Sequence, residues 1–313
     1  MEKAMKILTV SSANMDLNIR CAVAPEKGQT LFGASYRYVS GGKGANSATA
    51  FARLGAHSVF CAALGSDENG KTLRSIYEQS GIDTDYILTL DDVPTGLATV
   101  TVEDSGANRI LVISGANAAL TAEHAIKSAK ECCPDAVFCH FEIPFDTVVK
   151  LSHYCSESGI PMFIDAGPAN ASLDLTRLAP VCVFSPNEKE TEEFTGIAPN
   201  DEDSCRRAAK ALAEKVTAKY YVLKLGSRGA AICEGEKVTI VPTYPVKAVD
   251  TTSAGDAFTA AMTLDLLRTG DIVHACKYGN AVGSVTVSRS GASESIPTLD
   301  ELDEFLKANS ITF

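Results

Sequence analysis

Short apolar segments bounded by Gly, Pro, Asp or Asn recur along the chain, each with the length and composition of a buried strand. These segments are Ile7–Val10, Val59–Leu64, Ala136–Cys139, Met162–Ile164, Val181–Phe184 and Tyr221–Leu225. Between most of them, apolar residues at helical spacing predict helices at Ala45–Leu54, Leu73–Gln79, Phe145–Ser158 and Ser204–Lys215. Strands that alternate with helices through short connections pair in parallel through right-handed crossovers. The pattern therefore predicts an α/β fold, a three-layer α/β/α body around a mostly parallel sheet.

Two strand-like pairs have no helix between their arms: Leu17–Ile19 with Tyr36–Val39, and Leu97–Val102 with Arg109–Ile113. The second pair carries the turn signal Asp104-Ser105-Gly106. We expect two hairpins that form a small antiparallel sheet, a lid built from about residues 15–40 and 95–114. Such a sheet has two faces to cover, so it should close over a ligand, pair with a second copy, or do both. Because no repeat or linker marks a second unit, residues 1–313 are predicted to form a single domain.

Composition narrows the class of protein. With 313 residues, 45% hydrophobic and 21% charged, the chain is an ordinary globular one, and its net charge of −11 disfavours a nucleic-acid or anionic-membrane binder. The ten cysteines are scattered through apolar runs, which favours reduced, buried thiols. The first residues lack a signal-peptide pattern, and no uncharged run approaches the roughly 20 residues of a membrane span. We therefore expect a cytoplasmic enzyme.

Small residues lead directly into a helix candidate, Thr259–Leu267, in the segment Asp250-Thr251-Thr252-Ser253-Ala254-Gly255-Asp256. Backbone N–H groups at Ala254 and Gly255 would point at an anion at the helix N-terminus. Asp256 has two interpretations. It caps the helix, or it is a base that deprotonates a hydroxyl for attack on phosphorus.

A glycine-rich turn, Ser40-Gly41-Gly42-Lys43-Gly44-Ala45-Asn46, also precedes a helix and would let backbone approach a ligand. The Asn46 amide suits sugar hydroxyls, although Asn is also ordinary near a helix start. Asn14 and Asp16 follow the first predicted strand, at the sheet edge where open α/β sheets bind ligands. Several polar groups should therefore converge on one edge.

Asn187 and Glu190 follow the strand Val181–Phe184 at the same edge. Glu190 would hold Mg²⁺, directly or through water, and Asn187 would bond a phosphate oxygen. A capping box at a helix start explains the same two residues equally well.

Together these segments resemble the ribokinase family of sugar kinases, also called the phosphofructokinase-B group, from Val10 to about Pro297. The two family signatures are Gly41–Asn46 and Asp250–Asp256, and between them lie Ser114-Gly115-Ala116-Asn117, Pro186-Asn187-Glu188-Lys189-Glu190 and Leu225-Gly226-Ser227-Arg228-Gly229. The chain departs from the family pattern at Ser253, where Gly or Ala is usual, and at Phe141–Pro144, which replaces a more polar surrounding. The departures put the sugar in question more than the reaction.

The resemblance implies a role for each matching residue. Asp256 would be the general base, and Ala254 and Gly255 the anion hole. Sugar binding would fall to Asn14, Asp16, Gly42, Lys43, Asn46 and Glu142, together with Asp256. The nucleotide would contact Asn187, Leu225, Gly226, Ser227, Arg228, Gly229, Gly255 and Asn280, and Glu190 would belong to the magnesium network. A K⁺ loop would comprise Asp250, Thr252, Thr286, Arg289, Gly291 and Ser295.

The resemblance thus implies a ribokinase-like enzyme that uses ATP, Mg²⁺ and K⁺ to phosphorylate a primary hydroxyl of a small sugar. D-ribose, giving D-ribose 5-phosphate, is the predicted substrate, and a ketohexose such as fructose, or a nucleoside, is the alternative. The partners would be the sugar and ATP, with no nucleic acid and no membrane. The lid sheet would pair two copies into a homodimer.

Two other classes compete on pattern alone. Gly65–Thr72 is a literal G-x-x-x-x-G-K-T match between a predicted strand and a predicted helix, which is typical of a P-loop NTPase. Asp67 and Glu68, however, would place two negative charges where phosphates should lie. His140-Phe141-Glu142 matches the H-x-E of zinc deaminases, but no Pro-Cys-x-x-Cys follows.

Overall fold

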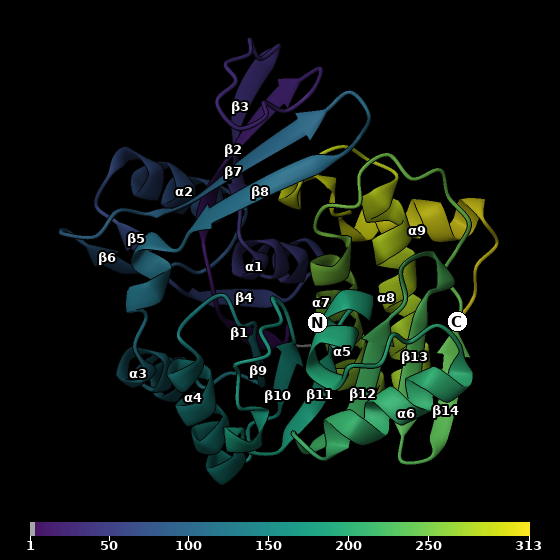
Figure 1. Ribbon diagram of the computed structural model, residues 1–313. Coiled ribbons are helices and arrows are strands. Elements are labelled where there is room, and N and C mark those ends of the chain that lie inside the picture. Colours follow the sequence, from purple (N-terminus) through teal and green to yellow (C-terminus); the bar gives the residue numbers. More distant parts are fainter. Residues whose placement is uncertain (1–3) are drawn as a thin grey trace.

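The computed structural model describes residues 4–313, and an eight-stranded sheet forms its centre (Figure 1). The strand order is β14-β13-β12-β11-β10-β9-β1-β4. Neighbours from β12 to β4 pair in parallel, and β13 and β14 extend the sheet in antiparallel fashion. The strands are β1 Lys6–Val10, β4 His57–Cys61, β9 Ala136–Cys139, β10 Met162–Asp165, β11 Val181–Ser185, β12 Ala218–Lys224, β13 Ala230–Glu234 and β14 Lys237–Val241. The predicted mostly parallel sheet is confirmed.

Helices cover both faces of this sheet, because its central strands are apolar on both sides. In β9, Val137 and Cys139 pack into one core, while Ala136 and Phe138 pack into the other. The first core is closed by α3 Ala122–Cys132, α4 Phe145–Ser158, α5 Glu188–Thr195 and α6 Glu202–Ala213. The second is closed by α1 Lys43–Arg53, α7 Ala254–Thr269, α8 Ile272–Val287 and α9 Leu299–Ala308. This is the three-layer α/β/α body that the pattern predicted.

The predicted strand Val59–Leu64 was wrong as a single element. The chain leaves the main sheet after Cys61, and β5 Ala63–Gly65 pairs instead with β6 Leu88–Leu90. Every residue from 59 to 64 is buried, so nothing in the apolar run marks the break. Helix α2, Glu68–Gln79, begins before its predicted start because the Asp67 side chain accepts a hydrogen bond from the Gly70 N–H group.

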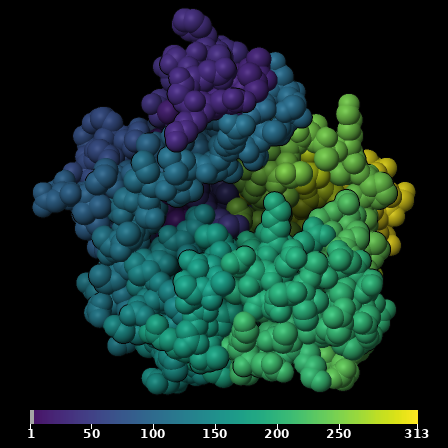
Figure 2. Space-filling model, in the orientation of Figure 1, coloured from purple at the N-terminus to yellow at the C-terminus, as the bar shows by residue number. Residues whose placement is uncertain are grey.

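The lid is a four-stranded sheet of order β3-β2-β7-β8. Its strands are β2 Asn14–Cys21, β3 Ser35–Gly41, β7 Gly96–Glu103 and β8 Asn108–Ile113. Both predicted hairpins are antiparallel, and the pairing of β2 with β7 that joins them is parallel. Figure 2 shows the lid above the body with a hollow between them.

Short 3₁₀ helices complete the chain at Gly115–Ala119, Leu175–Arg177, Gly226–Arg228 and Ser293–Ser295. None of the helices within residues 4–313 combines the length and the apolar character that a bilayer span requires.

Candidate active site

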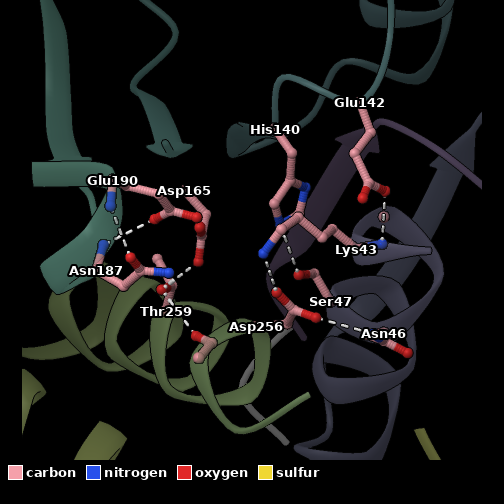
Figure 3. A network of polar contacts seen from close by, with 12 residues as sticks. Lys43, Asn46, Ser47, His140, Glu142, Asp165, Asn187, Glu190, Asp256 and Thr259 are labelled. Carbon is pink, nitrogen blue, oxygen red and sulfur yellow. Dashed lines mark hydrogen bonds and ion pairs between the residues drawn. The ribbon is translucent and has the colours of Figure 1, made fainter. Parts of the chain in front are cut away.

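The N-terminus of α7 places Asp256 between the body and the glycine-rich turn (Figure 3). Asp256 is almost fully buried, its Oδ1 atom lies 3.2 Å from Lys43 Nζ, and its Oδ2 atom accepts a hydrogen bond of 2.8 Å from Asn46 Nδ2. These bonds cross to α1 rather than to the first turn of α7. The capping interpretation of Asp256 therefore finds no support, and the carboxylate instead joins α7 to α1.

The residue before α7 departs from ordinary backbone geometry. Ser253 has φ +62°, the left-handed region that favours glycine, and it directly precedes Ala254 and Gly255, the first residues of α7. Its buried Oγ atom has no hydrogen-bond partner within residues 4–313, and the residue lines the cavity described below. The hydroxyl that departs from the family pattern thus borders the site.

The glycine-rich turn brings α1 against the end of β1. A Cβ atom on Gly41 would overlap the Asp16 carboxylate, and one on Gly42, where φ is +87°, would lie 3.0 Å from the Asn14 nitrogen. Only glycine allows both approaches. The doublet therefore sets the distance between α1 and the polar residues that begin β2.

Polar groups with spare bonding capacity lie on the lid side of Asp256. Glu142 Oε2 accepts hydrogen bonds from the Lys43 N–H group, at 3.0 Å, and from the Ser12 hydroxyl. Asp16 Oδ1 and Asn46 Oδ1 are buried with no partner in the described part of the chain. Burial, together with nearby Glu142, raises the pKa of Asp16 to about 7. Unpaired buried oxygens are costly, so this pocket is suited to a ligand rich in hydroxyl groups.

Asn117 positions this pocket, although sequence analysis assigned it only to a motif and to no role in binding. Its amide oxygen accepts from the Ala13 N–H group at 2.9 Å, and its Nδ2 atom donates to Asn14 Oδ1 at 2.7 Å. These bonds fix the chain where β1 passes into the lid.

A cavity of about 620 Å³ opens on the other side of Asp256. Of the residues predicted to bind nucleotide, those that line it are Asn187, Gly226, Ser227, Gly229, Gly255 and Asn280. Leu225 and Arg228 do not line it: Leu225 is buried, and the Arg228 guanidinium contacts Glu188, itself a lining residue, at 2.6 Å, and backbone carbonyls of Pro199 and Asn200. A cavity of this size fits a nucleotide.

Asn187 and Glu190 form a complete capping box at the start of α5. Asn187 Oδ1 accepts from the Glu190 N–H group at 2.9 Å, and Glu190 Oε2 accepts from the Asn187 N–H group at 2.7 Å. A Cβ atom on Gly167 would overlap Glu190 Oε1 and lie 2.9 Å from Lys43 Cε, so Oε1 points toward the site. The capping role leaves this second oxygen for water or a metal ion.

The two segments predicted to hold K⁺ lie against each other. Asp250 Oδ2 accepts from the Gly291 N–H group at 3.3 Å, and Asp250 Oδ1 accepts from the Thr252 hydroxyl at 2.6 Å. Although burial acts to raise it, these hydrogen bonds hold the pKa of Asp250 below its usual value. Arg289 turns to Glu301 at 3.0 Å, whereas Thr286 and Ser295 are buried. The Thr286 and Ser295 hydroxyls donate to the carbonyls of Val282 and Ala292, so the group of this set that suits a cation is the Asp250 carboxylate.

Sequence reasoning missed a buried polar cluster at the carboxyl ends of β9, β10 and β12. Lys224 Nζ lies 2.5 Å from Asp165 Oδ2, and the Thr259 hydroxyl donates to the same oxygen at 2.7 Å. The Lys224 and Lys43 ammonium groups overcome the effect of burial and depress the pKa of Asp165, whereas burial lowers the pKa of His140 to about 4. The signal available in the sequence was position, because each residue ends or directly follows a buried strand.

His140, Asp165 and Asp256 each bring one potential metal-ligand atom within 4.8 Å of the others. Both carboxylates already contact an ammonium group, at Lys224 for Asp165 and at Lys43 for Asp256. Ion pairs therefore account for the two carboxylates of this cluster, and the cluster does not support the zinc-enzyme alternative.

The P-loop alternative fails on geometry. Asp67 occupies the inside of the Gly65–Thr72 loop, where its carboxylate accepts from the Gly70 N–H group at 2.8 Å and from the Thr95 N–H group and hydroxyl at 2.8 and 2.6 Å. Lys71 points outward to Glu68. A carboxylate fills the position that a phosphate would need.

Fold and site together match one class of enzyme: residues 4–299 match the pfkB family of carbohydrate kinases. The chain belongs to this family and is an ATP-dependent sugar kinase, so the resemblance carried by its two signatures is confirmed.

Individual relatives align over nearly their whole length. The ribokinase of Haemophilus influenzae is 34% identical over 304 residues, 96% of this chain and 99% of the relative. The deoxyribokinase of Salmonella typhi is 30% identical over 309 residues, 97% of this chain and 100% of the relative. The solved structure of Arabidopsis thaliana ribokinase complexed with ribose and ATP has a TM-score of 0.83 and 28% identity, and covers 97% of this chain and 99% of that one.

Proposed function

We propose that this kinase transfers the γ-phosphoryl group of ATP to the primary hydroxyl of D-ribose and forms D-ribose 5-phosphate. The observation that carries the proposal is the position of Asp256, between a pocket of unpaired buried oxygens and a cavity of about 620 Å³. The matches to a ribokinase and to a ribokinase structure containing ribose and ATP support the sugar.

In this proposal each group around Asp256 has a separate task. The sugar lies against Asn14, Asp16, Asn46 and Glu142, and Asp256 accepts the proton of the attacking hydroxyl. The N–H groups of Ala254 and Gly255 stabilise the charge that develops on the transferred phosphoryl group. Gly42 and Lys43 form the wall between the two ligands. Binding both ligands in one orientation supplies most of the rate enhancement in phosphoryl transfer.

The nucleotide lies in the cavity lined by Asn187, Gly226–Gly229 and Asn280. Asn280 is already oriented, since its Nδ2 atom donates to the Val241 carbonyl at 3.0 Å. Leu225 supports this wall from beneath, and Arg228 fixes it through Glu188.

The proposed reaction uses two cations, Mg²⁺ and K⁺, each held by its own set of residues. Glu190 Oε1 holds the magnesium ion of Mg-ATP, directly or through water, and the magnesium ion neutralises phosphate charge. The segments around Asp250–Thr252 and Thr286–Ser295 hold K⁺, with Arg289 and Gly291 shaping the loop. The contact between Asp250 and Gly291 supports this second site.

The alternatives concern the acceptor. Salmonella typhi deoxyribokinase matches at 30% identity, so 2-deoxyribose belongs beside fructose and a nucleoside among the acceptors to test. A coupled assay with ATP and Mg²⁺ would compare kcat/KM for ribose, 2-deoxyribose, fructose and adenosine. We expect ribose to be the best acceptor, and a value for another acceptor at least about tenfold higher would overturn this assignment.

We also propose that residues 1–313 act as one domain and that two copies associate through the lid. The exposed side chains Tyr36, Tyr38, Ile110 and Leu111 support a dimer, because large apolar groups gather on the two edge strands β3 and β8. Light scattering should give twice the 33.0 kDa chain mass, and Leu111→Arg should give the monomer. A wild-type monomer at assay concentration would contradict the dimer. A cytoplasmic location stays a prediction from the sequence.

A further inference from the structure

Lys224 is a buried lysine at the carboxyl end of β12, and only 11% of its side-chain surface is exposed. Its ammonium group lies 2.5 Å from Asp165 Oδ2 and 3.4 Å from Thr259 Oγ1. Thr259 stands one turn into α7 and donates to the same Asp165 oxygen at 2.7 Å. The ammonium group is therefore fixed by a strand on one side and by α7 on the other.

This fixed ammonium group lies beside the proposed anion hole. A Cβ atom on Gly255 would lie 3.8 to 3.9 Å from the last three atoms of the Lys224 side chain. Lys224 lines the same cavity as Ala254, Gly255 and Asp256. Lys43 also lines the cavity and contacts the Asp256 carboxylate. A phosphoryl group held by the first N–H groups of α7 would thus be within reach of Lys224.

The cost of the ion pair indicates that it does more than hold the fold together. Burying a lysine and a carboxylate removes hydration free energy that their mutual attraction does not fully recover. Apolar side chains at the same positions usually stabilise a fold at least as much as the buried ion pair does. Asp165 Oδ1 has no hydrogen-bond partner in residues 4–313, so this pair is not fully satisfied. Two of the three ammonium N–H groups of Lys224 have protein partners in that range, which leaves one for a ligand in the cavity.

The Lys224–Asp165 ion pair supplies a fixed positive charge in the cavity proposed for ATP. ATP brings several negative charges to a chain whose net charge is −11. A cation that is already oriented stabilises charge in the transition state without reorganisation. Asp165 sets the position of that cation, and its depressed pKa keeps it ionised through the working pH range.

We propose that Lys224 donates a hydrogen bond to an oxygen of the γ-phosphoryl group during transfer, and that Asp165 and Thr259 are positioning residues for Lys224. In the step, the bond between the γ-phosphorus and the bridging oxygen of ADP breaks, and a bond from that phosphorus to the sugar oxygen forms. The hydroxyl proton passes to Asp256, and Lys224 keeps its own protons. The inference rests on the proposed use of ATP at this cavity.

The test compares Lys224→Met with the wild-type enzyme and with Lys219→Met, a control on the exposed part of the same strand. Loss of one preorganised donor should lower kcat by about 10²–10³ in Lys224→Met, with the KM for the sugar nearly unchanged. Calorimetry should show weaker binding of a non-hydrolysable ATP analogue and unchanged binding of ADP, which lacks the γ-phosphoryl group. Lys219→Met should behave as wild type.

If Lys224 had only a structural role, the measurements on Lys224→Met would differ from those expected above. The melting temperature of Lys224→Met would fall, ADP and the ATP analogue would lose equal affinity, and kcat of the folded fraction would stay within about threefold of wild type. That result would overturn the inference. If the Met variant does not fold, Lys224→Gln, which keeps a polar N–H donor on a shorter side chain and removes the charge, gives the same comparison.

A double-mutant cycle tests the role of Asp165. If Asp165 acts through Lys224, Asp165→Asn should lower kcat, and the double variant should have the kcat of Lys224→Met alone. Additive losses in kcat would show that Asp165 does not act through Lys224. A wild-type enzyme that phosphorylates none of the acceptors with ATP would contradict the proposed function itself, whereas an active wild type with an equally active Lys224→Met contradicts only this inference.

Discussion

Replacing Asp256 by Asn distinguishes the two roles that the sequence allows for this residue, a helix cap and a general base. Asn keeps the size of the side chain, and its amide oxygen still accepts the hydrogen bond from Asn46. The substitution removes the proton acceptor and the ion pair with Lys43, whose side chain is 25% exposed.

The structure fixes how large each effect should be. Loss of the general base lowers kcat by about 10²–10⁴, which raises the activation barrier by about 2.7–5.5 kcal/mol. Asp256 is almost fully buried and the Lys43 side chain is 25% exposed, but Lys43 keeps Asp165, Glu142 and Glu190 nearby, so loss of the ion pair should cost about 1–3 kcal/mol of folding free energy. Activity should therefore fall even when it is measured on the fraction of enzyme that remains folded.

The assay couples ADP release to NADH oxidation and is run with saturating ribose and Mg-ATP, beside thermal melting and calorimetry of ribose binding. Asp271→Asn is the matched control, because Asp271 caps the neighbouring helix α8 through the Val273 and His274 N–H groups. We expect unchanged kcat for the control and ribose affinity within about tenfold of wild type for Asp256→Asn. An Asp256→Asn enzyme with near-normal kcat and a lowered melting temperature would refute the base and establish a structural role.

Lys71→Ala should leave kcat unchanged because Lys71 only pairs with exposed Glu68, and a loss of about a hundredfold would move the nucleotide site to the loop at 65–72. Activity should be higher in K⁺ than in Na⁺ or tetramethylammonium at equal ionic strength, and equal rates in all three salts would contradict the cation site. Burial raises the pKa of Asp16 to about 7, so the folded protein favours the protonated carboxyl group. Protonated Asp16 therefore contributes to folding stability at low pH, and this contribution is lost as pH rises through 7. The ionised form is the better acceptor for sugar hydroxyls, so calorimetry should show ribose affinity rising from about pH 6 to 8, and Asp16→Asn should show no such rise.

The sequence by itself determined the class of fold and the location of the chemistry. Continuous apolar runs of strand length mark segments that are buried on two faces, and apolar residues at helical spacing mark helices that are buried on one face. Both patterns can be read from the sequence because the periodicity of a strand or a helix is a local property of the backbone. The Gly41–Asn46 and Asp250–Asp256 segments predicted turns that lead into helices, and the structure places Asn46 and Asp256 in direct contact. Polar residues just after buried strands predicted a site at one sheet edge.

Tertiary structure decided the pairings that have no local signal. Asp165 and Lys224 are 59 positions apart, and Asp165 follows an apolar run whereas Lys224 lies within one, so only the order of β10, β11 and β12 reveals their ion pair. The run from 59 to 64 is buried throughout, so its division between two sheets depends on which strands are available to pair. The parallel pairing of β2 with β7 likewise joins segments far apart in the chain. Local sequence sets how much of each segment is buried, whereas partners across the sheet are chosen by the packing of the whole chain.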